Sequence, residues 1–257
     1  MRVELLHSSM PPSDLQFLVS FLVNDEVAVD AGALGLLADL RRQQRVKHVF
    51  ITHEHQDHIA TLPIFLENVY EPGPDCVEVL ASQESLDFLH ADMFNGRVWP
   101  DFIGLSQPEN TFVNTTAIEP LQPVVRAGLT ITPVPVSHGV DTLGLVVDDG
   151  RTAVAFPSDT GPTDHLWQHL AAIDHLKAVF LEVSFPQAHA GLAALTGHLS
   201  PTTFAAEIAK LPNSVSRGVR FIVVHRKARY AAAIAGELAA MGLANVELVK
   251  PGHVYEF

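Results

Sequence analysis

The feature that most constrains this chain is a cluster of potential metal ligands that directly follows an apolar run. Residues 52–59 read T-H-E-H-Q-D-H-I, and His53, His55, Asp57 and His58 all fall within this stretch. The preceding residues 46–51 are largely apolar and β-branched, which predicts a buried strand. A helix is expected to start within 57–66. The cluster would therefore lie on the loop at the carboxyl end of a strand, where open α/β sheets place their functional sites.

The composition of the cluster itself indicates a metal. Imidazoles repel one another when protonated, and a carboxylate among them is costly to desolvate, unless a cation lies between these groups. Scattered surface histidines are the alternative interpretation. Further ligand candidates at the ends of other predicted strands favour the metal.

The rest of the chain predicts one α/β domain. Its 257 residues are 47% hydrophobic, which is ample for a large core, and no linker, repeat or low-complexity segment divides residues 1–257. Strands are expected at 3–6, 17–22, 27–29, 46–51, 77–80, 129–136, 143–147, 152–156, 178–183, 220–224 and 246–249. Helices are expected at 34–41, 83–94, 163–171, 187–195, 202–211 and 228–241. Asp149-Gly150 predicts a hairpin turn, and 98–114 an irregular connection.

Charge and cysteine content limit the classes of function. The formal charge of −13 argues against a broad polyanion-binding surface, although a small anion remains compatible with it. The single cysteine, Cys76, excludes an internal disulfide. The amino terminus has no extended apolar segment, and no stretch approaches the roughly 18 apolar residues that a transmembrane helix needs. We therefore expect a cytoplasmic protein without a membrane partner.

Four more acidic or imidazole side chains follow predicted strands. They are Asp30, His138, Asp159 and His225. Asp30 is expected to orient a ligand, with turn formation as the alternative. The other three are expected to bind metal, although a structural histidine or a helix-capping aspartate would give the same pattern. The expected arrangement is one metal on His53, His55 and His138, and a second on Asp57, His58 and His225, with Asp159 between them.

These motifs resemble those of a known superfamily. The run H-E-H-Q-D-H, followed in order by His138, Asp159 and His225, resembles the metallo-β-lactamase fold superfamily over nearly the whole chain. The resemblance implies an αββα four-layer sandwich of two mixed sheets flanked by helices. The segments F-L-E-V-S-F-P, T-G-H-L-S-P and V-V-H-R-K are similar to class II cyclic-nucleotide phosphodiesterases. Two departures are the amino-terminal H-S-S-M-P-P-S, which lacks a Gly-rich turn, and Ala228, where proline is typical.

The resemblance implies a dinuclear hydrolase acting on cyclic AMP or cyclic GMP. Two divalent ions, with zinc preferred over manganese or iron, would lower the pKa of a bridging water toward about 7, and the resulting hydroxide would attack phosphorus. His198 is expected to protonate the leaving oxygen, and Glu182 is expected to orient His198. Asp57, one of the expected metal ligands, is also expected to take part in catalysis. His198 and Lys227 are expected to contact substrate. Helix capping by His198, a salt-bridged Glu182 and a solvated Lys227 are the alternatives.

Other functions share the same ligands. A metal-dependent hydrolase of a thioester, lactone or lactam is the main alternative. An RNA-processing nuclease is disfavoured by the negative charge, a redox di-iron protein by His55, and a catalytically silent binding protein by the intact ligand set. The expected partner is a small-molecule phosphodiester, with no long nucleic acid, and a homodimer is the assembly considered.

Overall fold

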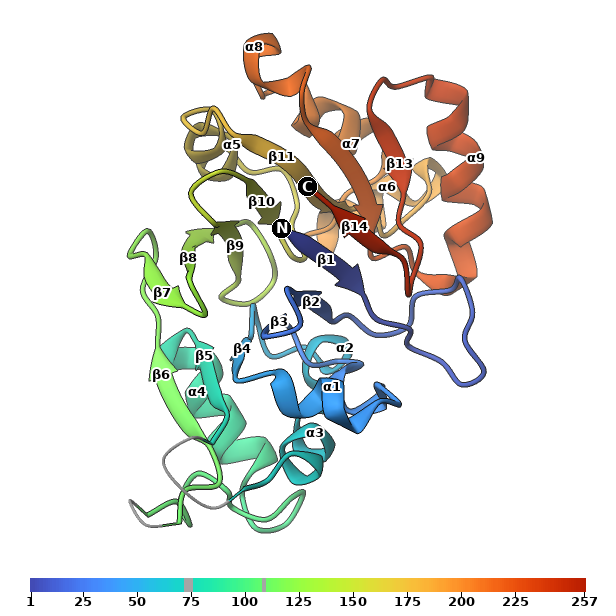
Figure 1. Cartoon of the computed structure of the whole chain (residues 1–257). Coiled ribbons are helices and arrows are strands. Elements are labelled where there is room, and N and C mark those ends of the chain that lie inside the picture. The colour runs from blue at the N-terminus through green and yellow to red at the C-terminus, as the bar shows by residue number, and fades with distance from the viewer. Residues whose placement is uncertain (72–75, 108–109) are drawn as a thin grey trace. The chain divides into compact units, whose positions relative to one another are not determined.

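The described residues form two compact units, each built on one sheet (Figure 1). The computed structural model describes residues 1–71, 76–107 and 110–257. The first unit comprises 1–14, 18–119 and 251–256, and the second comprises 15–17, 120–250 and residue 257. Each sheet is mixed and is flanked by helices, so the predicted pair of mixed sheets with helices is confirmed. The single-domain interpretation of 1–257 stays a prediction.

In the first unit, the sheet has the strand order β14-β1-β2-β3-β4-β5-β6 (Figure 1). The strands are β1 (Arg2–Leu5), β2 (Phe21–Val23), β3 (Val27–Val29), β4 (His48–Phe50), β5 (Glu78–Ala81), β6 (Asn114–Ala117) and β14 (Val254–Glu256). Neighbours are antiparallel from β14 to β3 and parallel from β3 to β6. The carboxyl ends of β3 and β4 therefore meet at one edge, and Asp30 and the ligand-rich loop begin there.

Short helices cover one face of this sheet. They are η1 (Leu34–Leu36), α1 (Leu40–Arg45), α2 (Gln56–Ile59), α3 (Leu62–Asn68), α4 (Gln83–Phe88) and the π-helical η2 (Leu89–Met93). Apolar side chains of α2 and α3, such as Ile59 and Phe65, are buried with Val49 of β4 and Val79 of β5 in one core cluster. This packing fixes the helix that carries Asp57 and His58 against the sheet.

Two expected helices of this unit are divided. The predicted helix at 34–41 is a 3-10 turn followed by α1, which begins after Asp39 because the Asp39 carboxylate accepts the N–H of Arg41. The predicted helix start at 57–66 gives α2 and α3, which separate at Thr61. Pro63 lies in the first turn of α3, where its missing N–H costs nothing.

In the second unit, the sheet has the order β13-β12-β11-β10-β9-β8-β7 (Figure 1). The strands are β7 (Val124–Arg126), β8 (Leu129–Pro135), β9 (Leu143–Asp148), β10 (Ala153–Phe156), β11 (Leu176–Glu182), β12 (Arg220–Val224) and β13 (Val246–Leu248). Neighbours are parallel from β13 to β10 and antiparallel from β10 to β7. Strands β8, β10, β11 and β12 consequently run in the same direction and end at the same edge.

Helices also pack on the sheet of the second unit. They are α5 (His165–Leu170), η3 (Gln187–His189), α6 (Ala190–Leu195), α7 (Pro201–Ile208), α8 (Asn213–Ser216), η4 (Ala228–Tyr230) and α9 (Ala231–Met241). Trp167, Phe204 and Ile234, from α5, α7 and α9, are buried in one cluster with residues of β10, β11 and β12. The predicted hairpin between β9 and β10 is confirmed, since the Asp149 N–H donates to the carbonyl of Thr152.

Some strands were not expected, because they are short or polar. Strand β6 carries N-T-T-A and is mostly exposed, while β7 and β14 have only three residues each. Of the irregular segment predicted at 98–114, residues 108–109 lie outside the described residues and Asn114 starts β6. Among the described residues, no helix is both long enough and apolar enough to cross a bilayer.

Candidate metal centre

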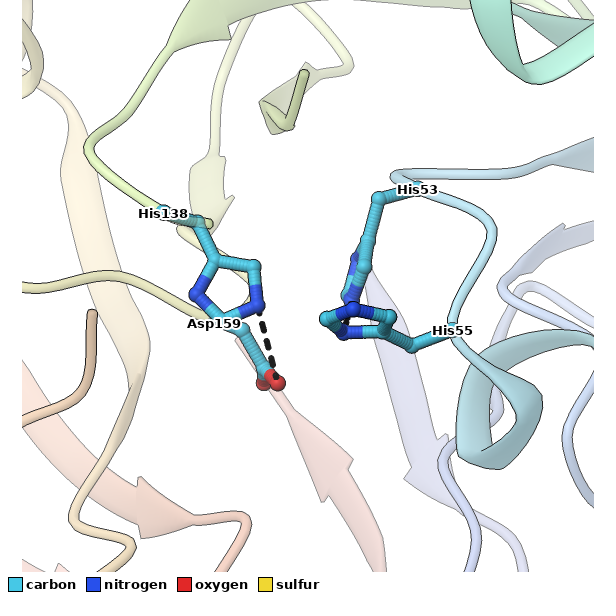
Figure 2. A group of neighbouring side chains, drawn as sticks. All are labelled: His53, His55, His138 and Asp159. Carbon is cyan, nitrogen blue, oxygen red and sulfur yellow. Dashed lines mark hydrogen bonds and ion pairs between the residues drawn. The ribbon is translucent and has the colours of Figure 1, made fainter. Parts of the chain in front are cut away.

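The loop after β4 brings imidazoles into contact within the first unit. His53 and His58 are buried, Asp57 is half-buried and His55 is exposed. Nε2 of His53 lies 3.0 Å from Nδ1 of His55, and Figure 2 shows both side chains on this loop. The ring centroids of His53 and His58 are 4.2 Å apart. Three rings this close fit a cation that keeps them deprotonated.

Asp30 contacts one of these rings. The residue follows β3, is 1% exposed, and accepts hydrogen bonds from the N–H and hydroxyl of Thr52 at 2.8 and 3.0 Å. Its Oδ2 lies 2.7 Å from Nδ1 of His58. When His58 is neutral, its proton is therefore held at Nδ1, and Nε2 keeps the lone pair that a metal needs.

Main-chain hydrogen bonds fix the position of Asp57 and His58. The N–H of Ala31 donates to the carbonyl of His58 at 2.7 Å, and the N–H of Val19 donates to that of Asp57 at 2.8 Å. Gly32 makes this approach feasible, because a Cβ there would lie 1.9 Å from the Asp57 carbonyl oxygen. Any larger residue at position 32 would displace the turn that presents both ligand candidates.

The second unit places His138 beside Asp159. The dashed line in Figure 2 joins Nε2 of His138 to Oδ2 of Asp159 over 3.9 Å. Nδ1 of His138 lies 2.9 Å from the carbonyl oxygen of Gly197 and must donate to it, because a carbonyl can only accept. Gly197 has a φ of +67°, and a Cβ there would approach the imidazole to 3.1 Å. In a neutral His138, Nε2 therefore carries the lone pair that a metal could bind.

The structure brings Glu182 and His198 into contact. Glu182 is completely buried at the end of β11, and its Oε1 lies 2.6 Å from Nδ1 of His198. The same carboxylate accepts the N–H groups of Thr160 at 2.9 Å, Ser184 at 3.1 Å and Leu199 at 3.3 Å. These donors hold the carboxylate in place. His198 does not cap α7, where the hydroxyl of Thr203 accepts the N–H of Ser200 instead.

Ser184 is a site residue that the sequence interpretation missed. Its hydroxyl lies 2.5 Å from Oε2 of Glu182 and 2.8 Å from Nδ1 of His225, which links two of the predicted functional groups. The available signal was its spacing in F-L-E-V-S-F-P, since residues two apart in an extended segment face the same side.

Four buried side chains of the second unit could share a cation. Asp159, Glu182, His198 and His225 each offer a ligand atom, and these atoms all lie within 4.8 Å of one another. Oδ1 of Asp159 is 3.3 Å from Nδ1 of His225. Two carboxylates and two imidazoles buried together are strongly unfavourable without compensating charge, so the donor set fits a metal ion.

Left-handed backbone occurs at three of the strand ends that carry these groups. Asp30, Ser158 and His225 have φ angles of +61°, +61° and +51°, and each follows the end of β3, β10 or β12 by one or two residues. A non-glycine residue in this left-handed region costs about 1–2 kcal/mol. Such strain is typical of residues whose side chains are aimed at a functional site.

Lys227 and His198 both lie against the aromatic ring of Phe185. Its Nζ is 5.4 Å from the ring centroid of Phe185, whose ring is 5.7 Å from that of His198. Cation–π attraction therefore holds the Lys227 charge on the same aromatic ring that contacts His198.

Comparison with known proteins gives a family and a fold. A family profile described as "Beta-lactamase superfamily domain" matches residues 27–225. Over 206 residues the chain is 28% identical to the "Probable 3′,5′-cyclic-nucleotide phosphodiesterase" of Yersinia pestis, an alignment that covers 72% of this chain. The same alignment spans only 58% of the Yersinia protein.

Solved structures show the same fold. The crystal structure of unliganded yeast PDE1 matches with a TM-score of 0.77 and 17% identity, covering 98% of both chains. Zinc-bound PqqB from Methylobacterium extorquens matches with a TM-score of 0.68 and 16% identity, covering 100% of both chains. At identities of 16–17%, these similarities establish a shared fold alone.

Proposed function

The chain belongs to the beta-lactamase superfamily, and from this premise we propose that it is a metal-dependent phosphodiesterase acting on a small cyclic nucleotide, cyclic AMP or cyclic GMP. The observation that carries the proposal is the 2.6 Å contact between Glu182 and His198 beside Asp159 and His225. An alkoxide that leaves phosphorus needs a proton, whereas the thiolate of a thioester leaves without one. A buried carboxylate–imidazole pair therefore favours the phosphodiester over the thioester alternative.

We propose that the ligand candidates of the two units hold two divalent metal ions. The first ion would bind His53, His55 and His138, the second Asp57, His58 and His225, with Asp159 shared. Zinc is the proposed ion, and manganese or iron would suit the same donors. The hydrogen bonds from Nδ1 of His58 to Asp30 and from Nδ1 of His138 to Gly197 support this assignment, because both leave Nε2 available to a metal.

When bound, the two cations supply Lewis acidity, which lowers the pKa of water and offsets the charge that develops on the phosphate oxygens. The residues of the chain supply the proton. Glu182 holds the Nδ1 proton of His198 and stabilises the imidazolium, so the transferable proton is the one on Nε2. As water loses a proton to solvent and attacks phosphorus, the bond to the leaving oxygen breaks, and that oxygen keeps the electron pair and takes the Nε2 proton.

Lys227 is proposed to contact the phosphate together with His198. Its ammonium group lies over Phe185, which also contacts His198, so the cation is held close to the proposed acid. A lysine acts on phosphate as a point charge and needs no fixed geometry. The net charge of −13 fits a small substrate rather than a long nucleic acid, because the local positive charge of metals and Lys227 does not extend into a broad basic surface.

The test is a comparison of substrates on one zinc- or manganese-loaded preparation. Cyclic AMP, cyclic GMP and an activated bis-aryl phosphate are assayed beside a thioester, a lactone and a lactam. We expect phosphodiester turnover, and a large loss of cyclic nucleotide turnover in His198→Gln with the metal content unchanged. Absence of turnover of all three phosphodiesters at full metal loading would refute the proposal.

A further inference from the structure

Gln16 reaches the second unit from near the amino terminus. Residues 15–17 belong to that unit, although the residues on either side of them belong to the first. Gln16 forms an isolated parallel bridge with Lys227. Its side chain is 7% exposed, whereas Leu15 and Phe17 are 40% and 52% exposed. A segment that exposes two large apolar residues in order to bury an amide reverses the usual preference, which indicates a role for the amide.

The amide oxygen of Gln16 holds the strained turn at His225. Oε1 accepts a hydrogen bond of 2.8 Å from the main-chain N–H of His225, whose φ is +51°. The main-chain carbonyl of His225 accepts a hydrogen bond of 3.1 Å from the hydroxyl of Ser184. Side chains from two distant segments therefore bind both polar main-chain groups of His225 and offset the cost of its left-handed conformation.

The amide nitrogen of Gln16 has a different environment. Because the N–H of His225 can only donate, the oxygen of the amide must face it, and Nε2 is the opposite end. Nε2 is buried and has no hydrogen-bond partner among the described residues. Burying an N–H donor without an acceptor costs about 1–3 kcal/mol, a cost that an oxygen of a bound ligand would remove.

We infer that Gln16 has two roles in the proposed phosphodiesterase. Oε1 positions His225 for its metal, and Nε2 donates a hydrogen bond to a phosphoryl oxygen of the substrate. The inference rests on the proposed function and deepens it, since it adds a neutral donor for an anionic oxygen to the charge of Lys227. The positioning role concerns the main chain and is present before any metal binds.

Two substitutions separate these roles. Gln16→Met removes both the acceptor and the donor, whereas Gln16→Glu keeps an oxygen for the His225 N–H and loses the donor. In the metal-free protein, we expect amide hydrogen exchange across residues 223–227 to be at least about tenfold faster in Gln16→Met and unchanged in Gln16→Glu. We expect zinc to bind roughly tenfold more weakly to Gln16→Met, the usual loss when the support of a ligand is removed, and normally to Gln16→Glu.

Substrate binding tests the donor. Both variants should raise KM for cyclic nucleotide about tenfold, the effect of losing one hydrogen bond to a charged oxygen, and in Gln16→Glu kcat should stay within about threefold of the wild type. Gln168→Met on the exposed face of α5 is the matched control and should change none of these quantities.

Each result decides one part of the inference. Wild-type exchange and zinc affinity in Gln16→Met would overturn the positioning role, and an unchanged KM in Gln16→Glu would overturn the donor role. If the wild-type protein hydrolyses no phosphodiester, the proposed function and the donor role fail together. The exchange measurement still decides whether Gln16 holds His225, because it needs neither metal nor substrate.

Discussion

Replacing Glu182 by glutamine should remove the protonation of the leaving group while leaving most of the site in place. The carboxylate accepts five hydrogen bonds: two at Oε1, from Thr160 and His198, and three at Oε2, from Ser184 N–H, Ser184 hydroxyl and Leu199 N–H. An amide has only one acceptor oxygen, so one of these groups of donors must face an NH2 group. Loss of the negative charge also withdraws the stabilisation of the His198 imidazolium.

The expected magnitude depends on the leaving group. General-acid catalysis contributes about 10²- to 10⁴-fold, so kcat for cyclic AMP or cyclic GMP should fall by that factor in Glu182→Gln. This corresponds to about 3–5 kcal/mol in the activation free energy. A nitrophenolate leaves without a proton, so turnover of bis-(4-nitrophenyl) phosphate should fall by less than about tenfold. A larger loss of turnover for the cyclic nucleotide than for bis-(4-nitrophenyl) phosphate indicates that the general acid is lost and the rest of the site is intact.

The controls use His198 and the metal content. His198→Gln should show the same dependence on the leaving group, and the double variant should be no slower than the slower single one, because the two residues act as a unit. Zinc content and the circular dichroism spectrum should match those of the wild type. Equal losses for both substrates, or additive losses in the double variant, would refute the assignment of Glu182 and His198 as a proton-donating pair.

Three further predictions concern the first unit. Asp30→Asn should weaken zinc binding about 10- to 100-fold, because the amide no longer fixes the Nδ1 proton of His58, and zinc competition titration measures this. Gly32→Ala should lower the free energy of unfolding by about 3 kcal/mol, since the added methyl group collides with main chain, and a normal denaturant midpoint would contradict it. Arg42→Met should lower this free energy by about 1 kcal/mol at pH 7, and by progressively less as the pH falls below 3.8, the ordinary pKa of Asp25. Burial raises the pKa of Asp25, but the hydrogen bond from Arg42 and the charges of Arg42, Arg45 and Arg2 together outweigh burial and hold that pKa below its ordinary value. The stabilisation is therefore present above the ordinary pKa and is lost as the pH falls through the lower folded pKa. Urea melts at a series of pH values below 7 check this.

Sequence reasoning located the strand ends well because they combine two independent signals. An apolar run that stops at a histidine or aspartate predicts both a buried strand and a side chain at its carboxyl edge, and β4, β10 and β12 follow this pattern. Membership of the superfamily was predicted from the resemblance of the motifs, which also implied the pair of mixed sheets, and both are confirmed. The metal ligands and their division between two ions stay predictions.

What could not be predicted depends on contacts between distant parts of the chain. Ser184 gains its role only because β11 and β12 pair and bring His225 to its hydroxyl. Gln16 binds a main-chain group 209 positions away, and nothing in its local sequence indicates a functional amide. Strand β14 is too short for a periodic pattern and forms because β1 offers an antiparallel partner.

The number of zinc ions retained per chain tests the central claim most directly. After loading and removal of weakly bound metal, elemental analysis should find two zinc ions in the wild-type protein. In Asp159→Ala it should find fewer, because that carboxylate is proposed to serve both ions. A wild-type protein that retains one ion or none would contradict the dinuclear site on which the proposed hydrolysis depends.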